Sequence, residues 1–209
     1  KSIFTNSSGI LVSRVLGLVR DLLTASVLGA NIYSDIFFIA FKLPNLFRSI
    51  FADGAFTQAF IPSYAKSKHK IRFSSVIFLQ LFGFLIILSL IVTMFSHIVA
   101  QAFAIGFSQE TVDLAAPLFA INFYYLPIIF TVTFMAALLQ YKHHFATSAY
   151  STALLNLGMI GALLISRNMD KYEITFYLSY GVIFGGFLQI LVHVIAIKRA
   201  NLCKIFFFF

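Results

Sequence analysis

The sequence contains no tryptophan, a single cysteine and few charged residues. Charged side chains make up 11% of the 209 residues and hydrophobic ones 60%, against about 25% and about 45–50% in a soluble domain. The one cysteine, Cys203, excludes an internal disulfide and a thiolate metal cluster. With a mean hydropathy of +0.94, this composition predicts an integral membrane protein.

Six stretches of the chain are long and apolar enough to cross a membrane, which takes about 20 residues per helix. They cover about 8–28, 32–51, 76–103, 112–139, 148–165 and 174–197. Their apolar runs are continuous, whereas the strands of a membrane β-barrel alternate between apolar and polar residues. We therefore expect an all-α membrane protein in which residues 1–209 form a single lobe of six transmembrane helices.

Lysine and arginine are distributed unevenly between the two sides of this predicted topology. One side holds only Arg167 and Lys171, and the other side holds nine basic residues. Four of the nine lie in an expected polar loop over 61–75, where Pro62 marks a helix end. Because basic loops stay in the cytoplasm, both termini are predicted to be cytoplasmic. Although the net charge is +8, the basic residues lie in short loops or within apolar helices, so we expect no nucleic-acid partner.

Four basic residues lie inside the first two predicted spans, namely Arg14, Arg20, Lys42 and Arg48. A charge at the bilayer centre costs roughly 2.5–3.5 kcal/mol, so the three charges of the first span, Arg14, Arg20 and Asp21, oppose insertion by roughly 8–10 kcal/mol. Such residues need a polar interior. The simplest interpretation is a hydrated cavity with cationic walls that holds an anionic substrate inside the membrane.

The embedded charges have another interpretation, in which they form buried ion pairs that only fix helix packing. The pairs would join the first-span arginines to Asp21 or Asp35, and Arg48 to Asp53. Four cations against three anions leave one positive charge in excess. Arginine is suited to bidentate contact with phosphate, so the excess favours an anionic ligand.

The second span has one polar face and a proline. Asp35 and Lys42 are seven residues apart and share a face, which Asn45 extends. Pro44 removes a backbone hydrogen bond near the middle of the span and should bend it. A bend beside charged groups is a feature that a gating helix requires.

Three charged segments of the sequence are in register with a known family. They read SRVLGLVRD (13–21), AFKLPNLFR (40–48) and FADGAFTQAFIP (51–62). They closely resemble the opening of the MurJ/MviN lipid II flippases, which belong to the multidrug/oligosaccharidyl-lipid/polysaccharide exporter superfamily. Later segments, LLNLGMIG (154–161) and GGFLQ (185–189), are also similar.

The resemblance implies a bacterial cytoplasmic (inner) membrane transporter of two six-helix lobes. It would move the undecaprenyl-diphosphate-linked peptidoglycan precursor, lipid II, from the inner to the outer leaflet by alternating access. The chain corresponds to the N-terminal lobe, so we expect a fragment whose partners are the missing C-terminal lobe, the lipid-linked precursor and membrane lipids. No cofactor is expected.

The resemblance also implies roles for individual residues. Arg14, Arg20 and Arg48 match the family's cavity arginines, which are thought to hold the diphosphate. The supporting or gate positions are Ser13, Asp21, Asp35, Lys42, Pro44, Asn45 and Asp53. Asp53 departs from the family pattern, in which glutamate is more frequent.

Two further functions remain open from the sequence. One is a related exporter of polysaccharide lipids or drugs, although the positive excess argues against a drug-cation antiporter. The other is a non-transporting membrane scaffold that binds lipid. We expect no enzyme, because no serine, cysteine or carboxylate pair is set beside a histidine for catalysis, and no metal site, because the adjacent His143 and His144 point in different directions.

Overall fold

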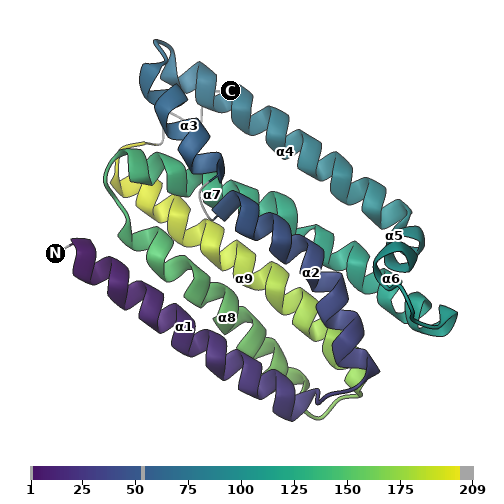
Figure 1. Ribbon diagram of the computed structural model, residues 1–209. Coiled ribbons are helices and arrows are strands. Elements are labelled where there is room, and N and C mark those ends of the chain that lie inside the picture. Colours follow the sequence, from purple (N-terminus) through teal and green to yellow (C-terminus); the bar gives the residue numbers. More distant parts are fainter. Residues whose placement is uncertain (1, 53–54, 203–209) are drawn as a thin grey trace.

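The computed structural model describes residues 2–52 and 55–202, with side chains from residue 7 onward except those of residues 48 and 50–52. Within these ranges the chain folds into helices and no strand, so the all-α prediction is confirmed there (Figure 1). The helices are α1 (Ser2–Val27), α2 (Ile32–Ala52), α3 (Ala55–Lys66), α4 (Lys70–Met94), α5 (Ser96–Phe103), α6 (Gln109–Phe123), α7 (Tyr125–Tyr141), α8 (Ala146–Ser166) and α9 (Lys171–Arg199).

Four helical segments of the described chain are long and apolar enough to cross a membrane. They are Lys70–Met94, Gln109–Tyr141, Ala146–Ser166 and Lys171–Arg199. These segments correspond to the last four predicted spans, and the chain is accordingly a multi-pass membrane protein. The transmembrane character of α1 and α2 stays a prediction, since their embedded charges lower their apolar content.

Three boundaries differ from the prediction. The helix expected over 76–103 is interrupted at Phe95, and the one over 112–139 is interrupted at Tyr124. The prediction of a loop over 61–75 is wrong, because α3 continues through Pro62 to Lys66 and α4 begins at Lys70. Pro62 lies past the first turn of α3, where it lacks one intrahelical hydrogen bond, and the packing of the aromatic side chains of α3 offsets that loss.

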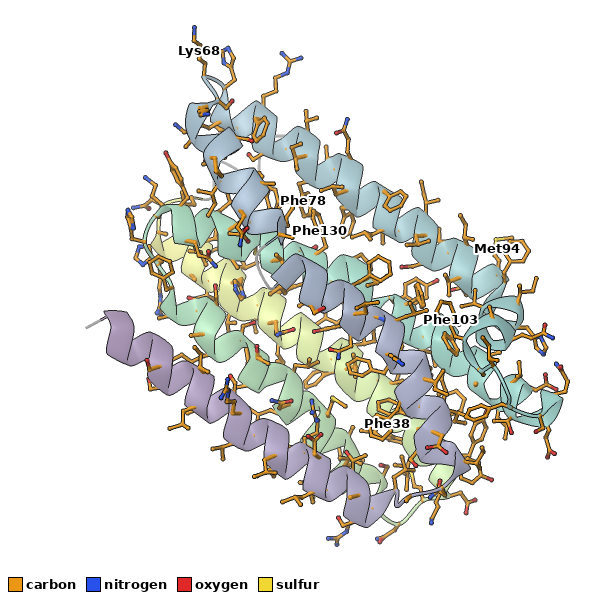
Figure 2. All side chains as sticks on the ribbon, viewed as in Figure 1. Phe38, Lys68, Phe78, Met94, Phe103 and Phe130 are labelled. Atoms are coloured by element: carbon orange, nitrogen blue, oxygen red, sulfur yellow. The ribbon has the colours of Figure 1, made fainter. Side chains whose placement is uncertain are left out.

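That packing is aromatic. Phe60 and Tyr64 of α3 are buried, and the rings of Phe60 and Phe134 lie 5.1 Å apart. Between α4 and α7 the rings of Phe78 and Phe130 are stacked at 5.9 Å, and Figure 2 shows them facing each other. Such ring pairs stabilise beyond their buried area.

The centre of the bundle is α7, in which every residue from Tyr125 to Leu139 is buried. A helix that is apolar all round belongs in the interior. The helices α2, α3, α4 and α9 pack around it, and the outer faces of α1, α4 and α9 carry large exposed apolar side chains, as expected where lipid replaces water.

The first two helices diverge although they are consecutive. After α1 the chain turns at Gly29, whose φ is +79°, and Asn31 Oδ1 accepts the backbone N–H groups of Tyr33 (2.9 Å) and Ser34 (3.2 Å) at the start of α2. On one side of the turn α1 packs against α8, and on the other side α2 packs against α6, α7 and α9. Figure 1 shows α8 and α9 between them.

Glycines bring α8 and α9 into close contact. A Cβ atom on Gly158 would lie 2.6 Å from the carbonyl oxygen of Gly181 and 2.8 Å from the Cα of Gly185. Small residues at such positions let membrane helices approach backbone to backbone. The contact fixes the spacing of α8 and α9, and through α8 it positions α1.

We expect Gly158→Ala to lower the free energy of unfolding by about 1–3 kcal/mol, since the added methyl group meets backbone that cannot give way. Gly161→Ala is the matched control, because nothing lies within 4 Å of a Cβ atom there. Thermal unfolding of both variants in detergent measures the difference. Equal midpoints for the two variants would contradict the close contact.

Candidate functional site

The polar side of α1 is attached to α8 by a short chain of hydrogen bonds. The Ser13 hydroxyl donates to the carbonyl oxygen of Ala149 (3.2 Å), and Asn156 Nδ2 donates to the carbonyl oxygen of Ser13 (3.0 Å). Ser13 is buried and Asn156 is 3% exposed. The predicted supporting residue Ser13 therefore lies at a helix interface, where its role is to fix α1 in place.

Arg20 is held by the same asparagine. Its Nη1 donates to Asn156 Oδ1 (2.9 Å), while Nε and Nη2 both donate to Asp21 Oδ1 (3.0 and 2.7 Å). The Arg20 side chain is 25% exposed and that of Asp21 is 63% exposed. The guanidinium is thus oriented by two partners and still open on one side, an arrangement that can accept an added anion.

Asn156 is a residue that the role assignments from sequence missed. The sequence signal was present, because Asn156 lies within the LLNLGMIG segment, but a neutral amide in an apolar helix shows no charge imbalance. Its importance follows only from the contact between helices, since Arg20 and Asn156 are 136 residues apart in the chain.

Arg14 differs from Arg20 in having no hydrogen bond or ion pair with any part of the chain that the structure describes. It is exposed, and its seven-residue spacing from Asp21 puts both side chains on one side of α1. The ion-pair interpretation therefore accounts for Arg20 with Asp21, and leaves Arg14 as a cation available to a ligand.

Asp21 and Asp35 lie at the end of the molecule where α1 turns into α2. Both line a hollow of about 510 Å³, together with residues of the turn and of the first turn of α2. Asp35 is exposed and makes no ion pair with a described residue. The structure thus brings two predicted gate carboxylates to one hollow, beside the Arg20 side chain that pairs with Asp21.

The remaining predicted residues lie on or after α2. Lys42 and Asn45 are exposed, and Pro44 is buried within the helix, which continues beyond it to Ala52. The described contacts do not join Lys42 to the arginines of α1. The side chain of Arg48 and all of Asp53 lie outside the described part of the structure, so their roles stay predictions.

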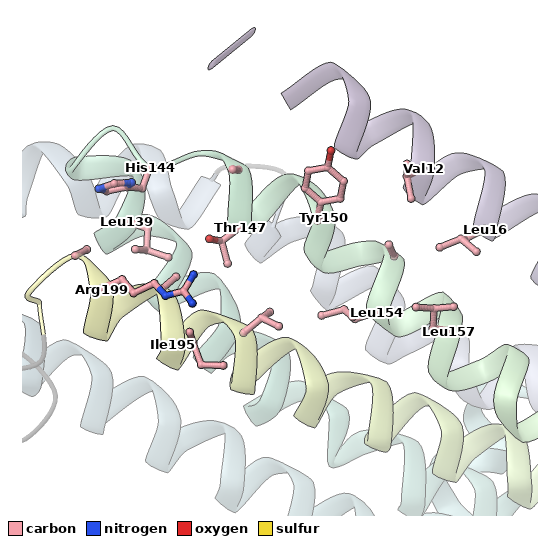
Figure 3. A pocket seen from close by; sticks show the side chains of 15 residues that line it. Val12, Leu16, Leu139, His144, Thr147, Tyr150, Leu154, Leu157, Ile195 and Arg199 are labelled. Carbon is pink, nitrogen blue, oxygen red and sulfur yellow. The ribbon is translucent and has the colours of Figure 1, made fainter. Parts of the chain in front are cut away.

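A separate hollow of about 820 Å³ lies between α1, α8 and α9, and it contains none of the predicted site residues. Figure 3 shows its apolar wall, with Val12 and Leu16 from α1 and Leu154 and Leu157 from α8, and with Arg199 at another part of the rim. Its apolar lining fits acyl chains better than a charged group. Among the described residues no group of three or more His, Cys, Asp or Glu side chains could hold a metal ion.

Comparison with protein families gives one match over most of the chain. The family described as "Lipid II flippase MurJ" matches residues 24–209. A protein of Helicobacter pylori (strain J99), named probable lipid II flippase MurJ, is 50% identical over 183 residues, which are 88% of this chain and 40% of that protein. A Rhizobium tropici protein of the same name is 34% identical over 213 residues, 97% of this chain and 40% of that protein.

A solved structure shares the fold. It is named "Lipid II flippase MurJ, inward closed conformation", and it superimposes with a TM-score of 0.78 at 24% sequence identity, over 96% of this chain and 46% of that chain. The chain thus spans about 40% of the length of the curated relatives that it matches. The resemblance of the chain to this family is confirmed.

We expect Asn156→Ala to lower the free energy of unfolding by about 1–3 kcal/mol, because the buried carbonyl of Ser13 and the partly buried Arg20 both lose a partner. Gln58→Ala is the control, since it removes an amide from an exposed position of α3. Thermal unfolding in detergent measures both variants. If Asn156→Ala unfolded at the same temperature as the parent, the hydrogen bonds between α1 and α8 would not be the contacts that hold α1 in place.

Proposed function

The chain belongs to the lipid II flippase MurJ family, and on that premise we propose that it forms the N-terminal lobe of a flippase. The transported molecule is lipid II, the undecaprenyl-diphosphate-linked peptidoglycan precursor, which moves from the inner to the outer leaflet of the bacterial cytoplasmic membrane. The relatives that are named for this activity are longer, and this chain covers about 40% of their length. The proposal extends their activity to the lobe that this chain forms.

The observation that carries the proposal is the pair of arginines on α1. Arg20 is oriented by Asn156 and Asp21, and Arg14 is exposed, less than two turns away, with no partner among the described residues. Two guanidinium groups match a diphosphate in charge, and each one is suited to bidentate contact with a phosphate group. We infer that they hold the diphosphate, with Arg48 as the third cation from α2.

We further propose that α1 and α2 cross the membrane, which gives the lobe six spans. At 1.5 Å per residue, the 26 residues of α1 and the 21 of α2 span roughly 39 and 31 Å, enough for a hydrocarbon core of about 30 Å. Their charges are tolerable because a hydrated cavity, shared with the C-terminal lobe, replaces lipid on one side.

Asp21 and Asp35 are proposed as gate residues at the closed end of this cavity. They line the hollow where α1 turns into α2, so any change in the angle between the two helices changes the spacing of the two carboxylates. Pro44, inside α2, supplies a point where the helix lacks one backbone hydrogen bond. Alternating access then follows from rocking of this lobe against the second one.

We expect Arg14→Ala and Arg20→Ala each to weaken binding of undecaprenyl diphosphate at least about tenfold, because each removes a charge-assisted hydrogen bond to the diphosphate. Native mass spectrometry of the chain with this lipid measures the loss. Lys68→Ala is the control, since Lys68 is an exposed cation between α3 and α4. Equal weakening by all three changes would point to nonspecific attraction, and no weakening by any would refute the diphosphate role.

We propose that both ends of this lobe face the cytoplasm, and the chain offers a direct test. In a Cys203→Ser background, Met169→Cys in the turn between α8 and α9 is expected to react with a membrane-impermeant maleimide on intact cells, whereas Lys68→Cys is expected to stay unlabelled. Both positions are exposed, so membrane sidedness alone decides the result. The opposite pattern would invert the topology.

A further inference from the structure

A second, polar cavity of about 200 Å³ lies among α3, α7, α8 and α9, and no predicted site residue lines it. Apolar residues of α7 and α8 form part of its wall, but most of its surface is hydroxyl, amide and imidazole. The polar lining residues are Thr57, Thr133, Gln140, Ser148, Ser151, Thr152, Gln189 and His193. We name it the His193 cavity. None of its lining residues carries a carboxylate or a cationic guanidinium or ammonium group.

Three side-chain atoms at this cavity are buried and lack a hydrogen-bond partner within the described structure. They are Ser148 Oγ, Ser151 Oγ and His193 Nε2. Ser151 is 5% exposed and His193 is fully buried. An unsatisfied buried polar atom destabilises a fold, so three at one place indicate that something else satisfies them.

The free nitrogen of His193 restricts what that partner is. Its Nδ1 lies 2.8 Å from the carbonyl oxygen of Gln189, and because a carbonyl only accepts, Nδ1 carries the proton. In the neutral imidazole Nε2 is then an acceptor. An imidazolium is disfavoured in a buried site without a carboxylate. Nε2 therefore calls for a ligand group that donates an O–H or N–H, which an ionised phosphate oxygen does not do.

The cavity is rigid on the side of α9. Gln189 Nε2 donates to the carbonyl oxygen of Ser151 (3.0 Å), and the Tyr125 hydroxyl lies 3.4 Å from Gln189 Oε1. Because both the nitrogen and the oxygen of its amide are hydrogen-bonded, Gln189 holds α8 against α9. It bonds to the Ser151 carbonyl, so the Ser151 hydroxyl stays available for a ligand in the cavity. The polar groups are thus preorganised, as a specific binding site requires.

The cavity and the arginine site share α8. Thr152, at the rim of the cavity, is exposed, and it lies four residues before Asn156, which accepts the hydrogen bond from Arg20. Residues four apart share a helix face and are separated by about 6 Å along the axis. A molecule whose diphosphate is held by Arg20 can therefore reach the His193 cavity with the group next along its length.

Resting on the proposed function, we propose that the His193 cavity is the subsite for an uncharged hydroxyl- and amide-bearing part of the transported molecule, namely a sugar unit of the head group attached to the diphosphate. With a volume of about 200 Å³, the cavity has room for several waters, which a sugar ring with its N-acetyl group replaces. His193 Nε2 accepts a ligand O–H or N–H, and the serine hydroxyls bond to ligand oxygens.

The test compares two lipids by native mass spectrometry of this chain, undecaprenyl diphosphate without sugar and lipid II. For the parent we expect tighter binding of the sugar-bearing lipid. His193→Leu and Ser151→Ala are each expected to lower the ratio of the two affinities by about fivefold, since each removes one buried hydrogen bond to the ligand, and to leave binding of the bare lipid unchanged. Because Ser151→Ala only deletes a hydroxyl, this variant tests the subsite even if His193→Leu folds poorly.

Two controls separate this inference from the proposed function. Ser166→Ala removes a buried hydroxyl at the other end of α8, where it donates to the carbonyl oxygen of Ala162 (2.8 Å), and the affinity ratio should stay as in the parent. Arg20→Ala should weaken both lipids equally. Failure of either lipid to bind the parent would overturn the proposed function and this subsite with it.

The remaining outcomes bear on the subsite alone. An affinity ratio that stays unchanged in both His193→Leu and Ser151→Ala, with the bare lipid still bound, would show that the cavity holds only water. A loss of bare-lipid binding as large as the loss of lipid II binding would show that His193 and Ser151 merely support the fold. Either result would overturn the sugar subsite and leave the diphosphate site standing.

Discussion

The close contact between α8 and α9 is the constraint on which the candidate site depends. Glycines at 158, 181 and 185 let the two backbones meet, and α8 in turn carries Asn156, to which both Ser13 and Arg20 of α1 are bonded. The position of the Arg20 guanidinium therefore follows from a contact between two helices that carry none of the embedded charges. A change in the spacing of α8 and α9 would move the arginine site and the His193 cavity together, since α8 lines both.

The charges of the first helix are only partly neutralised by the lobe itself. Arg20 is paired with Asp21, whereas Arg14 has no partner among the described residues. In a membrane such a cation is costly unless water or an anion is at hand. The described part of the lobe thus presents a cation on α1 that the lobe itself does not neutralise.

Much of the fold could be predicted from the sequence, because apolar runs of about 20 residues have few alternatives to helices in a membrane. The family could be predicted as well, since the charged residues of 13–21 and 40–48 occur in a register that chance does not produce. Interruptions at Phe95 and Tyr124 and the helix over Ala55–Lys66 were missed. They depend on packing between helices, such as the Phe60 and Phe134 rings, which periodicity along one segment does not report.

The sequence by itself determined the helical class, the family and the positions of the embedded cations, because each follows from local composition or from residues close together in the chain. Only the tertiary structure decided that Asn156 orients Arg20, that Asp21 and Asp35 share one hollow, and that Ser151 and His193 face a common cavity. These are contacts between residues far apart in the chain. Their geometry is set by how closely the helices pack, which no single segment encodes.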